Sequence, residues 1–432
     1  MKMTKWALLA GAALAVTATA ARADDLSALK AQIEALQSRV SQLEAQPQAA
    51  MPSGYSLMAI RDGQGTYEGV LPERNADMVR DSSGFTLSVL PTADAAPAAE
   101  VSVSGEIRTA LIYTDDSLEF NDDFNGPGAD DFDESEDNLD VKVRGRIFIK
   151  GKADTAVGEV GGYFRLQADG GGNFSDYSES TKMNKAYGWW KFAPNWEFMA
   201  GYNDNTAALQ VGWDWVAASG PVSSFGPSNA NNEQMRLTYT SGPLSFAISL
   251  EDADHDQYGN SDLPNAQAYL MYSSDAFTAQ VVGLVQDDDF GDDLDWALGG
   301  GGTVGISDGF QITAGAVVGE GTSLYANNIG PDTFDSDFWG ASVGLIAHLS
   351  EDTRLELGAG YEDYDQDQGS SDAFGVGGGV YWDPVSQVTV GAGATYVERN
   401  FSDEATRVQI DDDGDLDHDT LEVFFGTWLR FP

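Results

Sequence analysis

From Val101 to the C-terminus, the chain alternates apolar and polar residues in runs of about ten. In the first run Val103 and Ile107 share one face of a predicted strand, and Ser104 and Arg108 share the other. This period of two is typical of a β-strand with one apolar and one polar face. Sixteen such runs begin near residues 101, 139, 158, 185, 196, 233, 244, 264, 276, 296, 310, 338, 353, 374, 388 and 420. The pattern predicts an all-β fold over residues 101–432.

The connections between these runs alternate between short and long. Short ones include 241–242, 307–309, 350–352 and 383–384, and long ones include 115–138, 203–232, 287–295, 322–337 and 400–419. A soluble sandwich also has alternating strands, so strand number and connections must decide the architecture. An even strand number, with short turns on one side and long loops on the other, is typical of a bacterial membrane barrel. We therefore expect a sixteen-stranded antiparallel transmembrane β-barrel.

Aromatic residues lie where the predicted strands would cross the two membrane interfaces, as is common in membrane proteins. Those near long connections are Tyr113, Tyr361 and Tyr396, and those near short turns are Tyr239, Tyr272, Trp382 and Phe431. Two rings of aromatic side chains are therefore expected on the outside of the barrel.

The first 23 residues have the composition of a secretory signal peptide. Lys2 and Lys5 precede an apolar stretch over residues 6–16, and an Ala-Arg-Ala end follows at residues 21–23. An N-terminal membrane anchor is the alternative, but the apolar stretch is too short to span a bilayer. We expect cleavage after Ala23 and export of the mature chain.

Residues 24–45 predict a short coiled-coil helix. Its unbroken heptad seam consists of Leu26, Leu29, Ile33, Leu36, Val40 and Leu43. β-Branched residues at a with Leu at d would favour two strands. However, residues 39–44 resemble the R-h-x-x-h-E motif of short trimeric coiled coils, in which Arg39 would pair with Glu44 of a neighbouring helix. We favour a homotrimer over a lone amphipathic helix.

Residues 46–100 are predicted to form a periplasmic linker, because five prolines interrupt the periodicity of apolar and polar residues. Residues 55–60 and 84–90 are plausible short strands within it. We can assign no chemistry to this linker.

The final predicted strand places alternate residues outward up to the near-terminal Phe431, and Pro432 follows. This resembles the C-terminal signal that the outer-membrane assembly machinery reads, although the aromatic residue is usually the last. The pattern from Val101 onward looks like the sixteen-stranded trimeric porins of Gram-negative outer membranes, some of which carry a periplasmic coiled coil. The resemblance implies an outer-membrane homotrimer that contacts lipids, lipopolysaccharide and small hydrophilic solutes.

Charge and composition exclude several other classes. The chain has 69 acidic and 23 basic residues, a net charge of −46, which argues against nucleic-acid binding. It has no cysteine, so disulfide frameworks and cysteine-based metal sites are excluded. The three histidines, His255, His348 and His418, fall in or beside connections on different parts of the barrel. We therefore expect no enzyme, no catalytic residues and no bound metal as part of the function.

Basic residues are unevenly distributed along the barrel. Eleven of the fifteen after residue 100 lie between Arg108 and Arg236, and none lies between residues 237 and 353. A charge facing lipid at mid-bilayer costs about 2–4 kcal/mol, so those on polar strand faces should line the lumen. The predicted basic wall consists of Arg108, Lys142, Arg144, Arg146, Arg165 and Arg236. The alternative is that these side chains pair with acids in the wall and satisfy only the interior.

The connection over residues 203–232 is the third long one on its side. In the porins that this chain resembles, the third loop folds into the channel and narrows it. Here that connection holds Asp204 and Asp214, with Glu233 at its end. The resemblance thus implies a basic wall facing carboxylates, with a transverse field that orients polar solutes.

The long connections hold most of the negative charge. Residues 115–140 contain twelve acids and residues 287–295 contain six, and a further acidic run covers residues 411–419. Carboxylates of this kind could bind Ca²⁺ or Mg²⁺. Solvated acidic loops are the simpler interpretation, and we expect no cofactor.

The expected function is a water-filled outer-membrane channel for passive diffusion of small hydrophilic solutes and ions. One alternative is a substrate-selective channel for sugars or organic acids. The other is a structural tether or adhesin that uses the N-terminal helix.

Overall fold

A computed structural model of the protein describes residues 56–62, 85–90, 98–122, 132–170, 181–209, 231–252, 264–274, 276–287, 294–307, 309–321, 336–366, 369–401 and 414–431. The chain divides into two compact units. One consists of Met1–Leu57 and Leu90–Ala96, and of it only residues 56, 57 and 90 are described. The other consists of Met58–Val89 and Pro97–Pro432 and contains the sheet.

Every regular element in the described residues is a β-strand. Two short strands precede the main sheet: β1 (Leu57–Asp62) and β2 (Phe85–Leu90). The main sheet consists of β3 (Ala99–Asp122), β4 (Phe132–Thr155), β5 (Gly158–Gly170), β6 (Lys182–Ala193), β7 (Trp196–Asp204), β8 (Asn231–Ser241), β9 (Leu244–Glu251), β10 (Asn265–Ser273), β11 (Phe277–Asp287), β12 (Leu294–Ser307), β13 (Phe310–Glu320), β14 (Ser336–His348), β15 (Thr353–Gln366), β16 (Gly369–Val385), β17 (Val388–Phe401) and β18 (Gly414–Phe431).

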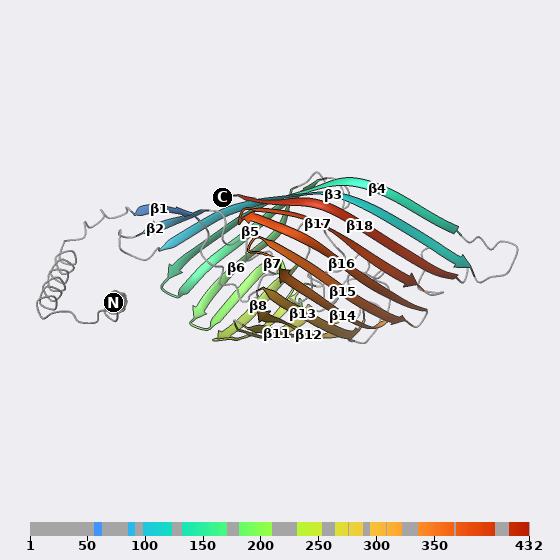
Figure 1. The fold of residues 1–432 in the computed structure, drawn as a ribbon. Coiled ribbons are helices and arrows are strands. Elements are labelled where there is room, and N and C mark those ends of the chain that lie inside the picture. Colours follow the sequence, from blue (N-terminus) through green and yellow to red (C-terminus); the bar gives the residue numbers. More distant parts are fainter. Residues whose placement is uncertain are drawn as a thin grey trace, which may run out of the picture. The chain divides into compact units, whose positions relative to one another are not determined.

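Strands β3 to β18 form a closed antiparallel barrel. Each pairs with the next in sequence, and β18 pairs with β3 from Gly414↔Asp122 to Phe431↔Gly105. Figure 1 shows the red β18 lying beside β3, where the barrel closes. Closure leaves no strand of the barrel with an unpaired edge in the membrane. The prediction of sixteen antiparallel strands is therefore confirmed for this part of the chain.

Three strands extend further than the sequence pattern predicted. β3 continues to Asp122, β4 begins at Phe132 and β18 begins at Gly414. The long connections predicted at 115–138 and 400–419 are thus wrong in extent. Alternation of apolar and polar residues indicates membrane burial, whereas these acidic extensions are held by backbone pairing, for example Asp116↔Thr420, and by polar side-chain contacts such as that of Thr420 with Asp116 at 2.9 Å.

The strands β1 and β2 lie where the two short strands of the linker were expected. β2 pairs antiparallel with the start of β3, from Phe85↔Val103 to Val89↔Ala99. Because β18 ends opposite Gly105, β2 continues the pairing along the same edge of β3. β1 pairs with β2 in turn.

The two faces of the barrel have opposite chemistry. Outward side chains are apolar and exposed, such as Leu139 at 63% and Val281 at 52%. Inward side chains include buried charged groups, such as Glu106 at 1% and Lys142 at 3%. A water-soluble sheet would bury its apolar face, so this inverted arrangement fits a barrel surrounded by hydrocarbon. Among the described residues, no helix is long and apolar enough to cross a membrane.

Aromatic side chains mark both ends of the outward face. Trp196 lies 4.9 Å from Tyr239 between ring centroids at the short-turn end, where Tyr272 also stacks on Phe277 at 5.0 Å. At the opposite end Trp339 lies 5.2 Å from Tyr361. These pairs fit the two interfacial rings that the sequence predicted.

Candidate functional site

Four residues of the predicted basic wall cluster on the inward face of β3 and β4. Arg108 lies directly opposite Arg144, and the next rows place Arg146 opposite Glu106 and Lys142 opposite Ala110. These side chains share the inward face because they are two residues apart along each strand. Sequence alternation alone was therefore sufficient to predict which way they point.

The other two predicted wall residues lie further round the barrel. Arg165 is on the adjacent β5, opposite Phe148 of β4. Arg236 is on β8, three strands beyond β5, and only 2% of it is exposed. The structure thus brings five of the six predicted residues onto three neighbouring strands and places Arg236 apart.

The fully buried Glu106 organises the cluster, a role that the alternation of residues did not predict. Its Oε1 lies 3.3 Å from Nη2 of Arg108 and 3.4 Å from Nη1 of Arg146. Its Oε2 accepts a hydrogen bond of 2.9 Å from Nε1 of Trp428. Lys142 lies 3.8 Å from Glu422 of β18. Part of the basic wall is therefore paired with acids, as the alternative interpretation of these residues expected.

The indole of Trp428 continues the network across the closure between β18 and β3. The guanidinium carbons of Arg108 and Arg430 each lie 3.9 Å from the ring centroid of Trp428. Two guanidinium groups cannot share one face at that distance, so the indole lies between them. Cation–π contacts of this kind stabilise most when they are shielded from water.

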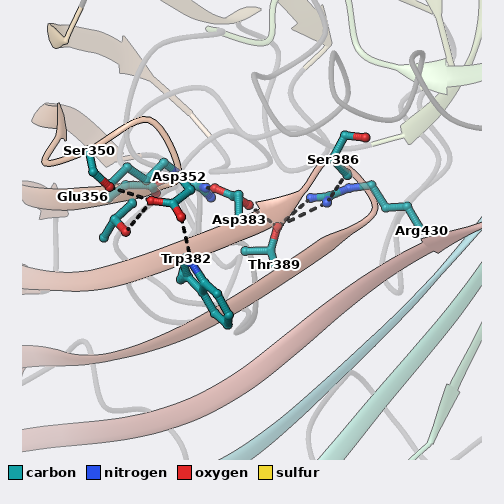
Figure 2. Close-up of polar contacts among 10 residues, drawn as sticks. Ser350, Asp352, Glu356, Trp382, Asp383, Ser386, Thr389 and Arg430 are labelled. Atoms are coloured by element: carbon teal, nitrogen blue, oxygen red, sulfur yellow. Dashed lines mark hydrogen bonds and ion pairs between the residues drawn. The ribbon is translucent and has the colours of Figure 1, made fainter.

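Figure 2 shows where this network reaches the short-turn end of the barrel. Arg430 donates to the carbonyl oxygen of Ser386 at 3.1 Å and to Oγ1 of Thr389 at 3.2 Å. Thr389 donates to Asp383, which also pairs with Arg354. Polar side chains thus tie the last strand to the turn between β16 and β17.

At the neighbouring turn, Asp352 holds an interfacial aromatic residue. It accepts hydrogen bonds from Ser350 at 2.7 Å and from the indole of Trp382 at 3.1 Å (Figure 2). These donors favour the charged form and hold the pKa of Asp352 below its usual value.

The start of the third long connection runs across the inside of the barrel wall. The backbone N–H of Thr206 donates to Glu251 of β9, and that of Ala207 donates to Gln267 of β10, both at 2.8 Å. Gln280 of β11 donates to the carbonyl oxygen of Ala208 at 3.1 Å. Residues 205–208 are at most 1% exposed. The inward course that the resemblance implied is present over these residues.

The predicted constriction acids do not form one group. Asp204 pairs with Lys185 of β6. Glu233 alternates with the outward Met235 and is exposed, so its predicted position facing the channel is wrong. The two-residue strand period fixes this outward direction, although the place of Glu233 at the end of the connection had suggested that it faces the channel. Asp214 lies outside the described residues.

Several other predicted residues also lie outside the described part of the chain. They are the signal peptide, the coiled-coil seam Leu26–Leu43, the Arg39–Glu44 pair and residues 123–131, 288–293 and 411–413. Phe431, the predicted assembly signal, is the last residue of β18 and lies over Gly105 on the outward face. Within the described ranges, no three His, Asp or Glu side chains form a group that could hold a metal ion.

The family model described as Gram-negative porin matches residues 86–400. The match covers β3 to β17 and all of the inward wall described above except the last strand. The chain belongs to the Gram-negative porin family. It is therefore an outer-membrane protein that forms a water-filled diffusion channel. The family and fold are those of channel proteins, which are usually not enzymes.

Two solved structures show the same fold as this porin. The outer membrane channel DcaP of Acinetobacter baumannii is 17% identical, with a TM-score of 0.54, covering 76% of this chain and 97% of that one. An anion-selective porin from Comamonas acidovorans is 14% identical, with a TM-score of 0.51, covering 77% of this chain and 100% of that one. No curated protein sequence matches this chain.

Proposed function

We propose that this porin is a homotrimer whose channels admit small anionic or zwitterionic solutes along a basic wall. The cluster of Arg108, Lys142, Arg144 and Arg146 carries the proposal. Glu106 pairs with Arg108 and Arg146, and Glu422 lies near Lys142, so two carboxylates serve three of these cations.

The overall charge of −46 acts mainly at the mouth of the channel rather than at the basic wall. Acidic outer loops raise the cation concentration at the mouth over about 8 Å at physiological salt. In a narrow section, nearby groups dominate because less water screens them. The mouth should therefore attract cations, while the basic wall favours anionic groups of permeating solutes.

Solute uptake into liposomes tests this proposal. The variant Arg144→Ser/Arg146→Ser should slow the entry of small carboxylates relative to neutral solutes of equal size. The matched control is Lys150→Ser/Lys152→Ser, which removes the same charge from the same face of β4 nearer the short-turn end. If the two variants change the uptake ratio equally, the basic wall has no special role.

The trimer rests on the predicted coiled coil and on the family resemblance. Each barrel would contain its own channel, and residues 24–45 would join three N-termini in the periplasm. Cross-linking in mild detergent should give trimers, and Leu36→Asp should weaken them by placing charge in the seam. Monomers alone in the unmodified protein would contradict this assignment. The alternative function as a structural tether or adhesin would depend on the same residues 24–45.

A selective channel for sugars or organic acids is the second candidate function. Inward aromatic rings favour it: Tyr163 and Tyr187 lie 5.3 Å apart, and Tyr187 and Trp189 lie 6.3 Å apart. However, Tyr187 and Trp189 are only 5% and 7% exposed, so their rings serve mainly in packing. Saturable block of single-channel current by sugars would favour the selective channel, and unaffected current favours general diffusion.

A further inference from the structure

The first residues of β3 extend past the end of the last strand at the short-turn end of the barrel. β18 ends at Phe431 opposite Gly105, whereas β3 begins at Ala99. β4 pairs with one edge of β3 as far as Ala99↔Ala153. Because a strand has only two edges, the barrel strands alone would leave residues 99–103 unpaired along the edge that β18 shares. An unpaired edge exposes backbone N–H and C=O groups and invites pairing with another chain.

The strand β2, which precedes the barrel, occupies this edge. It pairs from Phe85↔Val103 to Val89↔Ala99 and runs antiparallel to β3, as β18 does. β2 and β18 therefore follow each other end to end along β3 (Figure 1). The backbone N–H of Ala98 donates to the carbonyl oxygen of Val89 at 2.8 Å and closes the connection between β2 and β3.

The strand β2 has the two faces of a barrel strand. Ser88 is 4% exposed, whereas the adjacent Val89 is 40% exposed. Ser88 lies opposite Glu100 on the inward face, and Leu87 lies opposite the outward Val101. Side chains that alternate between two faces in this way continue the pattern of the wall. Residues 85–89 therefore have the chemistry of the barrel wall rather than that of a free connection.

A side-chain contact attaches β2 to a line of ion pairs across the inner wall. Oγ of Ser88 donates to Oε1 of Glu100 at 3.0 Å. Glu100 lies 3.5 Å from Nζ of Lys152, and Lys152 lies 3.7 Å from Glu159. Glu159 in turn lies 3.2 Å from Nζ of Lys191. The line thus runs from β2 through β3, β4 and β5 to β6, and charged groups contribute more to stability in such a network than as isolated surface pairs.

We propose that β2 is a clasp that keeps the barrel closed where β18 meets β3. It covers the edge of β3 beyond Phe431 and, through Ser88, holds the first carboxylate of the ion-pair line. Separation of β2 from β3 is then an early step in opening the closure. Residues 85–90 are therefore part of the channel wall and not only a linker. This role concerns the stability of the barrel and is independent of which solutes pass through it.

A disulfide between β2 and β3 tests the clasp, since the chain has no cysteine of its own. Leu87 and Val101 are directly opposite, and such residues have Cα atoms about 4.5–5.5 Å apart, within disulfide range. Oxidation of Leu87→Cys/Val101→Cys should form the bond in the folded porin and slow unfolding in denaturant relative to the reduced form. A contact that breaks before the transition state of unfolding controls that rate. Absence of the bond, or an oxidised form that unfolds at the reduced rate, would overturn the proposal.

The matched control is Leu270→Cys/Val281→Cys. These two outward residues are also directly opposite, in the hairpin of β10 and β11 away from the closure. The control bond restricts the unfolded chain in a similar way but joins no strand of the closure. It should leave the unfolding rate close to that of its reduced form. Equal slowing by both bonds would show a general effect of cross-linking and would overturn the proposal.

Glycine substitutions in β2 make the opposite change. Phe85→Gly/Leu87→Gly/Val89→Gly keeps the length of the connection but weakens the strand, so the porin should unfold several-fold faster. The control Met58→Gly/Ala59→Gly/Ile60→Gly weakens β1, which pairs with β2, and should change the rate less. An unfolding rate of the β2 variant equal to that of the unmodified porin would overturn the proposal.

Thiol labelling of the folded porin gives a readout that needs no destabilised variant. Ser88→Cys should be protected from N-ethylmaleimide, because the side chain at this position is buried, and Val89→Cys should react. Both should react equally after unfolding in hot SDS. If Ser88→Cys reacts as fast as Val89→Cys in the folded porin, β2 does not lie on β3 and the clasp does not exist.

Discussion

The inner wall of this porin has two regions with different surfaces. From β3 to β6, the inward positions carry long charged side chains, among them Arg108, Arg144 and Lys185. From β12 to β17, glycine recurs at inward positions: Gly299, Gly301, Gly315, Gly319, Gly340, Gly344, Gly358, Gly360, Gly375, Gly377, Gly379, Gly391 and Gly393. The cross-section of the channel is therefore asymmetric in both bulk and charge.

The glycine region is covered by flat aromatic rings rather than left bare. Tyr381 is directly opposite Gly391, and a Cβ at Gly391 would lie 2.4 Å from the ring. Phe338 lies over Gly319 in the same way, with 2.5 Å to a Cβ placed there. Ion pairs stabilise the charged side, whereas the glycine side adds ring packing to the ion pairs of Arg354 with Glu356 and Asp383, so each side should respond to a different substitution.

On the charged side, Glu106→Ala should have the largest effect. It leaves Arg108, Arg146 and the indole of Trp428 without their shared acceptor, and loss of one member of a buried ion pair costs about 3–5 kcal/mol. Denaturant unfolding in liposomes measures the change. The control Glu100→Ala removes a carboxylate from the same face of β3, where its partner Lys152 is 41% exposed, and should cost far less. Equal losses would show that Glu106 does not organise the wall.

On the glycine side, Gly391→Ala should destabilise the barrel by about 1–3 kcal/mol, because the new methyl group forces the Tyr381 ring to move. Gly145→Ala is the matched control, since a Cβ there meets no atom within 4 Å. The same unfolding assay should find Gly145→Ala close to neutral. Two neutral variants would mean that ring packing does not stabilise this region.

The alternation predicted the strands and the direction of nearly every wall residue, because both follow from a period of two. Pairing partners could not be predicted in the same way. Glu106 and Trp428 are 322 positions apart and meet only because β18 closes on β3. The contact of Glu251 with the backbone N–H of Thr206 likewise joins residues that are 45 positions apart.

The acidic extensions of β3, β4 and β18 contrast with the basic wall and should respond to divalent cations. Neighbouring carboxylates repel each other, and bound Ca²⁺ or Mg²⁺ would reduce that repulsion. We expect added Ca²⁺ to raise the melting temperature modestly and to slow proteolysis of the outer loops. Unchanged values after EDTA treatment would show that these cations do not contribute.

The smallest expected effect concerns pH at the short-turn end. Because hydrogen bonds from Ser350 and Trp382 lower the pKa of Asp352, its contribution is complete above the ordinary aspartate pKa of about 4. It is lost as pH falls through the lowered value. The difference in unfolding free energy between the unmodified protein and Asp352→Ala should therefore shrink below pH 4. The change should be small, because hydrogen bonds of a solvent-exposed carboxylate contribute little to stability. A difference that stays constant down to pH 2 would contradict this account.

The most direct test of the account is the reversal potential of single channels in a KCl gradient. Arg144→Ser/Arg146→Ser removes two of the four cations in the β3–β4 cluster and leaves the acidic outer loops intact. The account predicts that the reversal potential shifts toward cation preference and that conductance increases. An unchanged reversal potential in a folded double variant would show that these arginines serve only the wall and that selectivity arises elsewhere.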